Sequence, residues 1–207
     1  MRNVILILAA LGLGCSSPAS EPAPARSATP SPHTAAPSAA AEPSPTAAAA
    51  VASNAGGISW NAPAPFVARP PSSRMRAAEY VVEGDESALM TVFYFGAGQG
   101  GSVQANVDRW VGQMQQPDGR SSQDVAEVST RTIGDIDVTI VDVSGTYNAG
   151  MMGAPSATPQ ADRRMLGAIA EGPQGPIFFR LVGSVETLAR AQDAFDSLVA
   201  SFTLAPT

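Results

Sequence analysis

Residues 96–101 are the first candidates for ligand binding, because their glycines follow a known nucleotide-binding pattern. They lie between an expected strand and an expected helix. They read Gly-Ala-Gly-Gln-Gly-Gly and match the pattern G-x-G-x-x-G. In that pattern, backbone N–H groups at the start of a helix hold a pyrophosphate. The wider context argues against a dinucleotide, since the preceding strand belongs to an expected antiparallel hairpin. Asp118 and Asp124 follow at about the right distance, but they lie in a turn or loop and not at the end of a second strand.

Two interpretations of this glycine loop remain. It is a flexible connection between strand and helix, or it binds a small anion or a peptide carboxylate through Gly98, Gln99, Gly100 and Gly101. We expect no nucleotide and no other cofactor. The chain has no lysine to offset phosphate charge, and its formal net charge is −6.

Acidic residues offer a second kind of chemistry. Asp137 and Asp142 lie on one expected strand, but an odd separation places them on opposite faces, so they cannot form a tight carboxylate pair. Glu83, Asp85 and Glu86 crowd an expected hairpin turn and could hold Ca²⁺ weakly through oxygen atoms. Their spacing fits no EF-hand loop, and we interpret them as solvated turn charges. We therefore predict no metal site.

Two residue pairs are candidates for partner binding. Arg163 and Arg164 open an expected strand and could receive an acidic partner, or they are a solvated pair. Met151 and Met152 lie between glycines in a long expected loop. Adaptable methionine surfaces suit binding to varied partners, although the loop could equally fold back onto the domain.

The residue types that are missing exclude most enzyme classes. All 12 basic residues are arginine, His33 is the sole histidine, and Cys15 is the sole cysteine. His33 and Cys15 both precede the expected folded domain. That domain therefore lacks Ser-His-Asp and Cys-His sites, common zinc, copper and haem ligand sets, and any intrachain disulfide. The chain has no basic cluster, so we expect no nucleic-acid binding.

Cys15 carries the strongest signal in the chain. It follows one positive charge, Arg2, and an apolar run at residues 4–13 that is too short to span a bilayer. Gly14 before Cys15 resembles a bacterial lipobox, although Gly12 stands where leucine is usual. The resemblance implies cleavage after residue 14 and lipidation of Cys15, which would anchor the chain to a membrane. Ser16 in place of aspartate favours the outer membrane, facing the periplasm.

Composition then divides the chain into three parts. Residues 1–14 are the expected signal peptide. Residues 15–56 form a tether rich in Ala, Pro and Ser that cannot bury enough apolar surface to fold. Residues 57–207 have the length of a single domain.

Apolar periodicity predicts the elements of this domain. Alternation and turn residues predict strands in three hairpins, and 3.6-residue spacing predicts two amphipathic helices. Trp110 falls on the apolar stripe of the first helix, which predicts a core position. The expected strands cover residues 58–60, 75–82, 88–95, 128–133, 136–143, 165–171 and 177–182, and the expected helices cover 102–116 and 185–202.

The order hairpin, helix, two hairpins, helix predicts an α+β fold, an antiparallel sheet with helices on one or both faces. The order resembles the PsbP-like family, with its best local features at residues 105–110 and 195–202. Members of that family are mostly binding or assembly factors. The expected anchor, the long tether and the missing catalytic residue sets together predict a non-enzymatic, lipid-anchored envelope protein that binds another protein or envelope component. The alternatives are an enzyme that uses carboxylates alone on envelope glycans, and a small-ligand carrier that uses the glycine loop.

Overall fold

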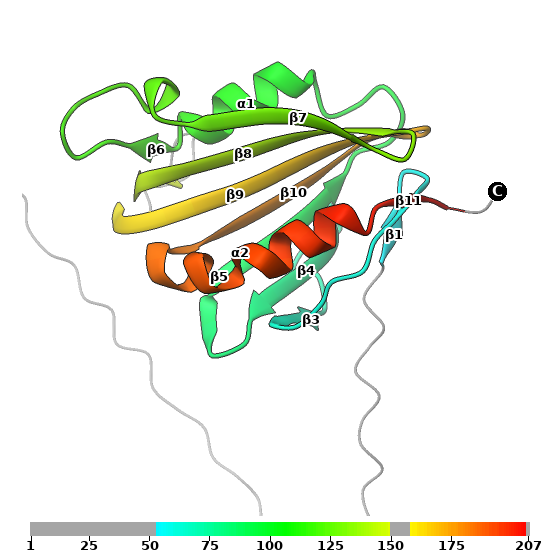
Figure 1. The fold of residues 1–207 in the computed structure, drawn as a ribbon, viewed down its shortest axis with the longest axis horizontal. Helices are drawn as coiled ribbons and strands as arrows, with labels where there is room; N and C mark the ends of the chain where they lie inside the picture. The colour runs from blue at the N-terminus through cyan, green and yellow to red at the C-terminus, as the bar shows by residue number, and fades with distance from the viewer. Residues whose placement is uncertain (1–52, 150–157, 206–207) are drawn as a thin grey trace, which may run out of the picture. The chain divides into compact units, whose positions relative to one another are not determined.

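The computed structural model describes residues 53–149 and 158–205 (Figure 1). Cys15, Met151 and Met152 lie outside the described residues. All described residues belong to one compact unit, Pro45–Thr207. No helix within them is long and apolar enough to cross a membrane.

The described residues form eleven strands, two α-helices and one short 3₁₀ helix. In chain order they are β1 (Asn54–Ala55), β2 (Ile58–Ser59), β3 (Phe66–Arg69), β4 (Arg76–Val82), β5 (Asp85–Tyr94), α1 (Val103–Val111), β6 (Met114–Gln115), η1 (Ser122–Asp124), β7 (Glu127–Ile133), β8 (Ile136–Tyr147), β9 (Gln160–Gly172), β10 (Gly175–Ser184), α2 (Val185–Ala200) and β11 (Thr203–Leu204).

A large antiparallel sheet dominates the fold. Its order is β3-β4-β5-β10-β9-β8-β6, with β7 also pairing with β8, and a small sheet β1-β2-β11 joins the two ends of the described chain. Every pairing is antiparallel. The expected α+β class is therefore confirmed, with a helix on each face of the sheet.

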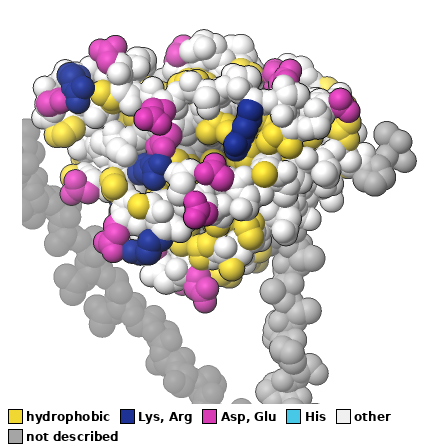
Figure 2. All heavy atoms as spheres, viewed as in Figure 1, with side chains coloured by type: hydrophobic (Ala, Val, Ile, Leu, Met, Phe, Trp, Pro, Cys, Tyr) yellow, Lys and Arg dark blue, Asp and Glu magenta, His cyan; other side chains and the backbone are white. Residues whose placement is uncertain are grey.

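Helix α2 covers one face of the sheet. Ser184 caps it, since its hydroxyl accepts a hydrogen bond from the backbone N–H of Thr187 at 3.0 Å. Leu188, Phe195 and Leu198 lie on its buried stripe and are fully buried. Figure 1 shows α2 lying across β9, β10 and β5. The space-filling view of the same face shows acidic side chains scattered among arginines and apolar patches (Figure 2).

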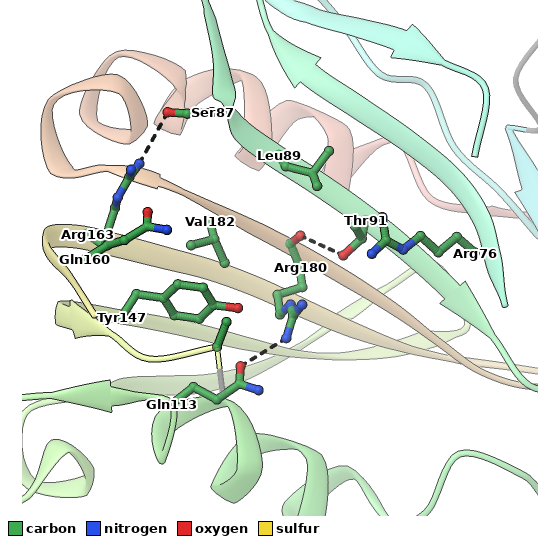
Figure 3. A pocket seen from close by; sticks show the side chains of 11 residues that line it. Arg76, Ser87, Leu89, Thr91, Gln113, Tyr147, Gln160, Arg163, Arg180 and Val182 are labelled. Atoms are coloured by element: carbon green, nitrogen blue, oxygen red, sulfur yellow. Dashed lines mark hydrogen bonds between the residues drawn. The ribbon is translucent and has the colours of Figure 1, made fainter. Parts of the chain in front are cut away.

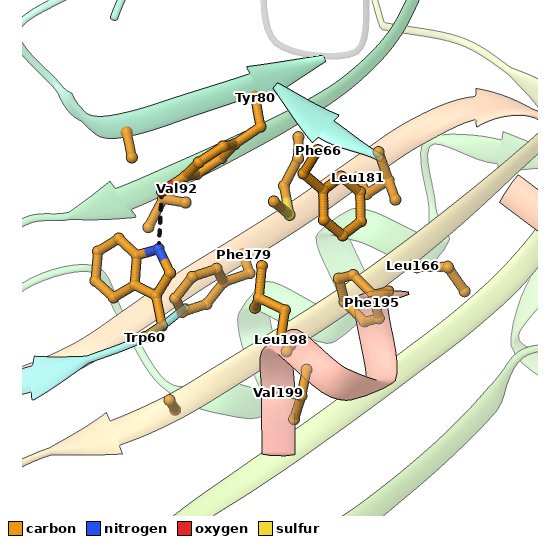
Figure 4. Packing of buried hydrophobic residues seen from close by; sticks show 14 of the residues in the cluster. Trp60, Phe66, Tyr80, Val92, Leu166, Phe179, Leu181, Phe195, Leu198 and Val199 are labelled. Atoms are coloured by element: carbon orange, nitrogen blue, oxygen red, sulfur yellow. Dashed lines mark hydrogen bonds between the residues drawn. The ribbon is translucent and has the colours of Figure 1, made fainter. Parts of the chain in front are cut away.

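Beneath α2 lies the larger of two hydrophobic clusters (Figure 4). Trp60 packs edge-on against Phe179, with ring centroids 5.1 Å apart. Its indole N–H donates to the hydroxyl of Tyr80 at 3.0 Å, which satisfies both buried polar groups. The edge strand expected at residues 58–60 is instead β2, Ile58–Ser59, the middle strand of the small sheet, and Trp60 follows it into the core.

Helix α1 covers only part of the opposite face. Ser102 caps it through a hydrogen bond from the backbone N–H of Ala105, and Val107, Trp110 and Val111 are buried. The helix ends at Val111, so the prediction of a helix to residue 116 was too long. Met114 continues the apolar stripe but belongs to β6, which pairs with Thr146 and Tyr147 of β8. A stripe of apolar residues does not distinguish a helix from the strand that follows it.

Two further differences concern strand length. β8 extends past the expected end at residue 143 to Tyr147, and β9 begins at Gln160, inside the loop expected at residues 148–161. Backbone pairing continues there through a register shift after Gly145, although the side chains no longer alternate in polarity. β3, at the edge of the sheet, was missed because four residues carry too little pattern.

Candidate functional site

A pocket of about 350 Å³ opens on the α1 side of the sheet, where the helix leaves β10 and β5 uncovered. Arg76 of β4, Arg163 of β9 and Arg180 of β10 line it (Figure 3). We call it the arginine pocket. The other described residues that line it are neutral, and no aspartate or glutamate is among them. Three guanidinium groups without a carboxylate in the lining suit an anion.

Arg180 stands at the centre of this face. It is paired across the sheet with Thr91 and with Gly167, and its Nη1 donates to Oε1 of Gln113 at 3.0 Å. Its Nε is buried and has no hydrogen-bond partner within the described residues. In Figure 3 the Tyr147 hydroxyl points toward this guanidinium. Burial lowers the pKa of Arg180; the nearby Arg76 and Arg109 add to that effect, and Tyr147 opposes it.

Arg76 is held at the rim by a buried carboxylate. Glu79 is fully buried and accepts hydrogen bonds from Arg76, from Nε of Arg69 at 3.1 Å, and from the hydroxyl and N–H of Ser72. Desolvation raises the pKa of Glu79, but the bonds from Ser72, Arg76 and Arg69 outweigh it and lower the pKa to about 2. Two arginines share one carboxylate, so this cluster retains a positive charge.

Arg163 and Arg164 face opposite sides of the sheet, because neighbours on a strand alternate. Nη1 of Arg163 approaches the Ser87 hydroxyl at 3.4 Å (Figure 3), and Arg163 forms no ion pair within the described residues. Arg164 lies on the α2 side, where it donates two hydrogen bonds to Asp142 and one to Gln192. Only Arg163 of this candidate pair therefore joins the arginine pocket.

The glycine loop at residues 96–101 is fastened to helix α1 and packs against β10. The buried side chain of Asn106 donates to the carbonyls of Gly100 and Ser102, at 2.8 and 2.9 Å. Gly100 has a φ of +93° and approaches the Phe178 ring so closely that a Cβ would lie 2.8 Å from it. The neighbours of β5 are both antiparallel, as expected. Gly98, Gln99, Gly100 and Gly101 do not line the arginine pocket.

Carboxylates meet at one other depression, on the α2 side. Glu127 and Asp142 are directly paired across β7 and β8 and line the same pocket. Asp142 is engaged there by Arg164, which makes it a poor general acid. Asp85 instead ties a hairpin to α2 through Thr187, and hydrogen bonds from Ser87 and Thr187 lower its pKa. Within residues 53–149 and 158–205, no cluster of three or more His, Cys, Asp or Glu side chains could hold a metal ion.

Comparison with known proteins concerns the fold alone. No protein-family model matches the chain, and no curated protein matches it. Seventeen chains of solved structures match. One is the solution structure of cyanobacterial PsbP (CyanoP) from Synechocystis sp. PCC 6803, with a TM-score of 0.45 and 11% identity over 72% of this chain and 87% of that chain. The similarity between the two chains is one of fold.

Sequence reasoning missed Arg76, Arg180 and Glu79. One signal was present, since Arg180 interrupts the apolar run of residues 177–182 with a charge. An arginine within an otherwise apolar central strand is costly unless something offsets it. A charge at such a position therefore indicates a candidate functional residue.

Proposed function

We propose that this chain is a non-enzymatic binding protein of the bacterial envelope, and that the arginine pocket receives an anionic group of its ligand. The observation that carries this proposal is the Arg180 guanidinium: among the described residues its buried Nε has no hydrogen-bond partner, and no carboxylate lines its pocket. Burying such a group costs stability unless it is paired. A bound anion would supply the missing charge and the missing acceptor.

Arg76 and Arg163 strengthen this proposal. Both present donors to the same pocket from other strands, and Gln113, Thr91 and Tyr147 add neutral polar groups beside them. A carboxylate or phosphate oxygen suits these donors, because charge-assisted hydrogen bonds from arginine are short and strong. The overall charge of −6 opposes anions at long range, so binding would depend on contact within the pocket.

Replacement of Arg180 tests this function with two independent measurements. We expect Arg180→Met to reduce affinity for acetate or inorganic phosphate by about tenfold or more, since a hydrogen bond to a charged group contributes about 1.5–3 kcal/mol. We also expect its thermal stability to be unchanged or raised, because an unpaired buried charge is removed. Calorimetric titration and thermal melts of the mature-length chain, residues 15–207 with Cys15→Ala, measure both effects.

Arg131→Gln is the matched control, because Arg131 lies on β7, outside the pocket, and its nearest acidic partner is Asp196 at 3.7 Å. This control should bind anions like the parent chain. If Arg180→Met bound both anions as tightly as the parent chain, or if the parent chain bound neither, the proposed function would be wrong.

The anchoring part of the proposal is supported by the apolar run, Gly14 and Cys15 in the sequence. We propose that residues 1–14 are removed and that Cys15 is lipidated, which places the domain at the envelope, with the outer membrane favoured by Ser16. A carboxylate-only enzyme has less support, since Asp142 is bound to Arg164. A carrier that uses the glycine loop has less support too, since Asn106 and Phe178 already occupy the loop's inner side.

Cys15→Ala tests the anchor directly. We expect this variant to leave the membrane fraction or to accumulate as an uncleaved precursor, because the lipid attachment atom is gone. Fractionation followed by mass measurement shows either outcome, and Ser17→Ala serves as the control that should stay with membranes. Cys15→Ala recovered in membranes at its mature size would rule out the lipid anchor.

A further inference from the structure

A second, mostly apolar pocket of about 410 Å³ adjoins the arginine pocket. We call it the aromatic groove. Its walls include Met75, Phe93, Phe95, Trp110 and Phe178, and it shares Gln113 and Arg180 with the arginine pocket. The hydrogen-bonded pair of Arg180 and Gln113 therefore borders both pockets.

Three phenylalanine rings line the aromatic groove. Phe93 lies near the end of β5 and Phe95 directly follows that strand; their rings are stacked, with centroids 5.9 Å apart and planes only 10° from parallel. Phe178 stands beside them, with its centroid 5.7 Å from that of Phe95. Phe95 is 37% exposed and Met75 is 62% exposed. Apolar side chains are thus left in water beside a cationic pocket, an arrangement typical of binding sites.

Arg76 lines the arginine pocket and lies near one ring of the aromatic groove. Its guanidinium lies 5.9 Å from the centroid of the Phe93 ring. Guanidinium groups present donors in a planar fork that matches a carboxylate, and aromatic rings prefer offset or edge contacts with other rings. The two recognition surfaces therefore meet at Arg180 and Gln113, with Arg76 close to the Phe93 ring.

We propose that the ligand is an aryl carboxylate, a flat apolar ring system that bears one carboxylate. The carboxylate lies between Arg180 and Arg76, and the ring lies in the aromatic groove against Phe93 and Phe95. This inference rests on the proposed function of the arginine pocket and specifies which kind of anion that pocket takes. The charge comes from the arginines of β4 and β10, and the preference for an aromatic group comes from Phe93 on β5 and Phe95 directly after it.

Four carboxylates of increasing apolar content test this inference on the mature-length chain with Cys15→Ala. They are acetate, cyclohexanecarboxylate, benzoate and 2-naphthoate, titrated at constant ionic strength and followed by calorimetry. We expect 2-naphthoate to bind about tenfold or more tightly than acetate, since burial of about 60 Å² of apolar surface suffices for that factor. We expect benzoate to bind more tightly than cyclohexanecarboxylate, because only benzoate has an aromatic ring that can pack against the phenylalanine rings.

Phe95→Leu isolates the ring from the charge. Phe95 is partly exposed, so the substitution should leave the fold intact, and a thermal melt checks this. The variant should lose most of the preference for 2-naphthoate and bind acetate like the parent chain. Val128→Ala, at an exposed apolar position on β7, is the control and should change neither affinity.

The outcomes separate this inference from the function on which it rests. Acetate binding that depends on Arg180, with no gain for 2-naphthoate, would overturn the aryl carboxylate and leave the anion pocket standing. Absence of binding by all four acids would overturn both proposals. Binding of 2-naphthoate that Arg180→Met leaves unchanged would also overturn both. A dimer by sedimentation that 2-naphthoate does not dissociate, and that Phe95→Leu abolishes, would show that a second copy occupies the groove and would overturn the inference.

Discussion

Trp110→Ala is expected to cost about 3–5 kcal/mol of unfolding free energy, the range for removal of a large buried aromatic side chain. Trp110 is only 3% exposed. Its ring stands edge-on to Phe178, with centroids 6.4 Å apart, and covers Gly167 so closely that a Cβ there would lie 2.6 Å from the indole. Total domain stability is typically about 5–15 kcal/mol, so this single change would remove a large part of it.

Denaturant titration at neutral pH measures this loss, and Gly167→Ala gives an independent check. A methyl group at Gly167 would push against the rigid indole, so that variant should also be destabilised. The double variant should cost less than the two single variants together, because the alanine at position 110 leaves room for the methyl group. Val128→Ala should change stability by less than about 0.5 kcal/mol.

A different result would change the role of Trp110. If Trp110→Ala unfolded at the same denaturant concentration as the parent chain but lost affinity for 2-naphthoate, Trp110 would be a ligand contact and not a core residue. The sequence predicted a core position from the helical stripe, and the burial of Trp110 confirms that position.

Glu79→Gln is expected to cost about 3 kcal/mol at pH 7, with a pH dependence of defined sign. The pKa of this carboxyl is about 2 in the folded chain against 4.5 for the free group. A depressed folded pKa means that the unfolded chain binds more protons between these values, so stability rises with pH through that window. A difference of this size corresponds to about 3 kcal/mol, present above pH 4.5 and lost as the pH falls toward 2.

Urea unfolding at pH 7 and at pH 3 measures this contribution. The parent chain should lose more stability than Glu79→Gln between these two values, because the variant has no carboxyl to protonate there. Glu186→Gln is the control, since the side chain of Glu186 is 85% exposed and its pair with Arg190 is a surface contact. If Glu79→Gln and the parent chain were equally stable at pH 7, the hydrogen bonds of the carboxylate would only offset the free energy spent on its burial, and this prediction would be wrong.

Local sequence determined the elements and the class of the fold. Hairpins followed from alternating polarity with turn residues between the arms, and both helices followed from apolar stripes behind Ser102 and Ser184, which the structure shows as caps. These signals act within about ten residues, so they are legible in one sequence. The antiparallel neighbours of the β5 strand also followed, and they argue against a dinucleotide at residues 96–101.

Cross-strand register decided the candidate site. Glu79, Thr91, Arg180 and Gly167 stand in one row across four strands, although more than 100 positions separate the first from Arg180 in the chain. Which face a residue takes depends on the parity of the pairing, and a shift of one residue would reverse it. Parity is the reason that Arg163 joins the arginine pocket while Arg164 meets Asp142 on the other side.

The extent to which each helix covers the sheet, like the strand register, was decided only by the tertiary structure. The sequence predicted two amphipathic helices but not how far each reaches. α1 ends at Val111 because Met114 and Gln115 pair with β8, and the short helix leaves β5 and β10 open on its side. Arg180 can therefore sit in an apolar strand and still reach a pocket. The charge that looks costly in the sequence lines a pocket because neither described α-helix covers it.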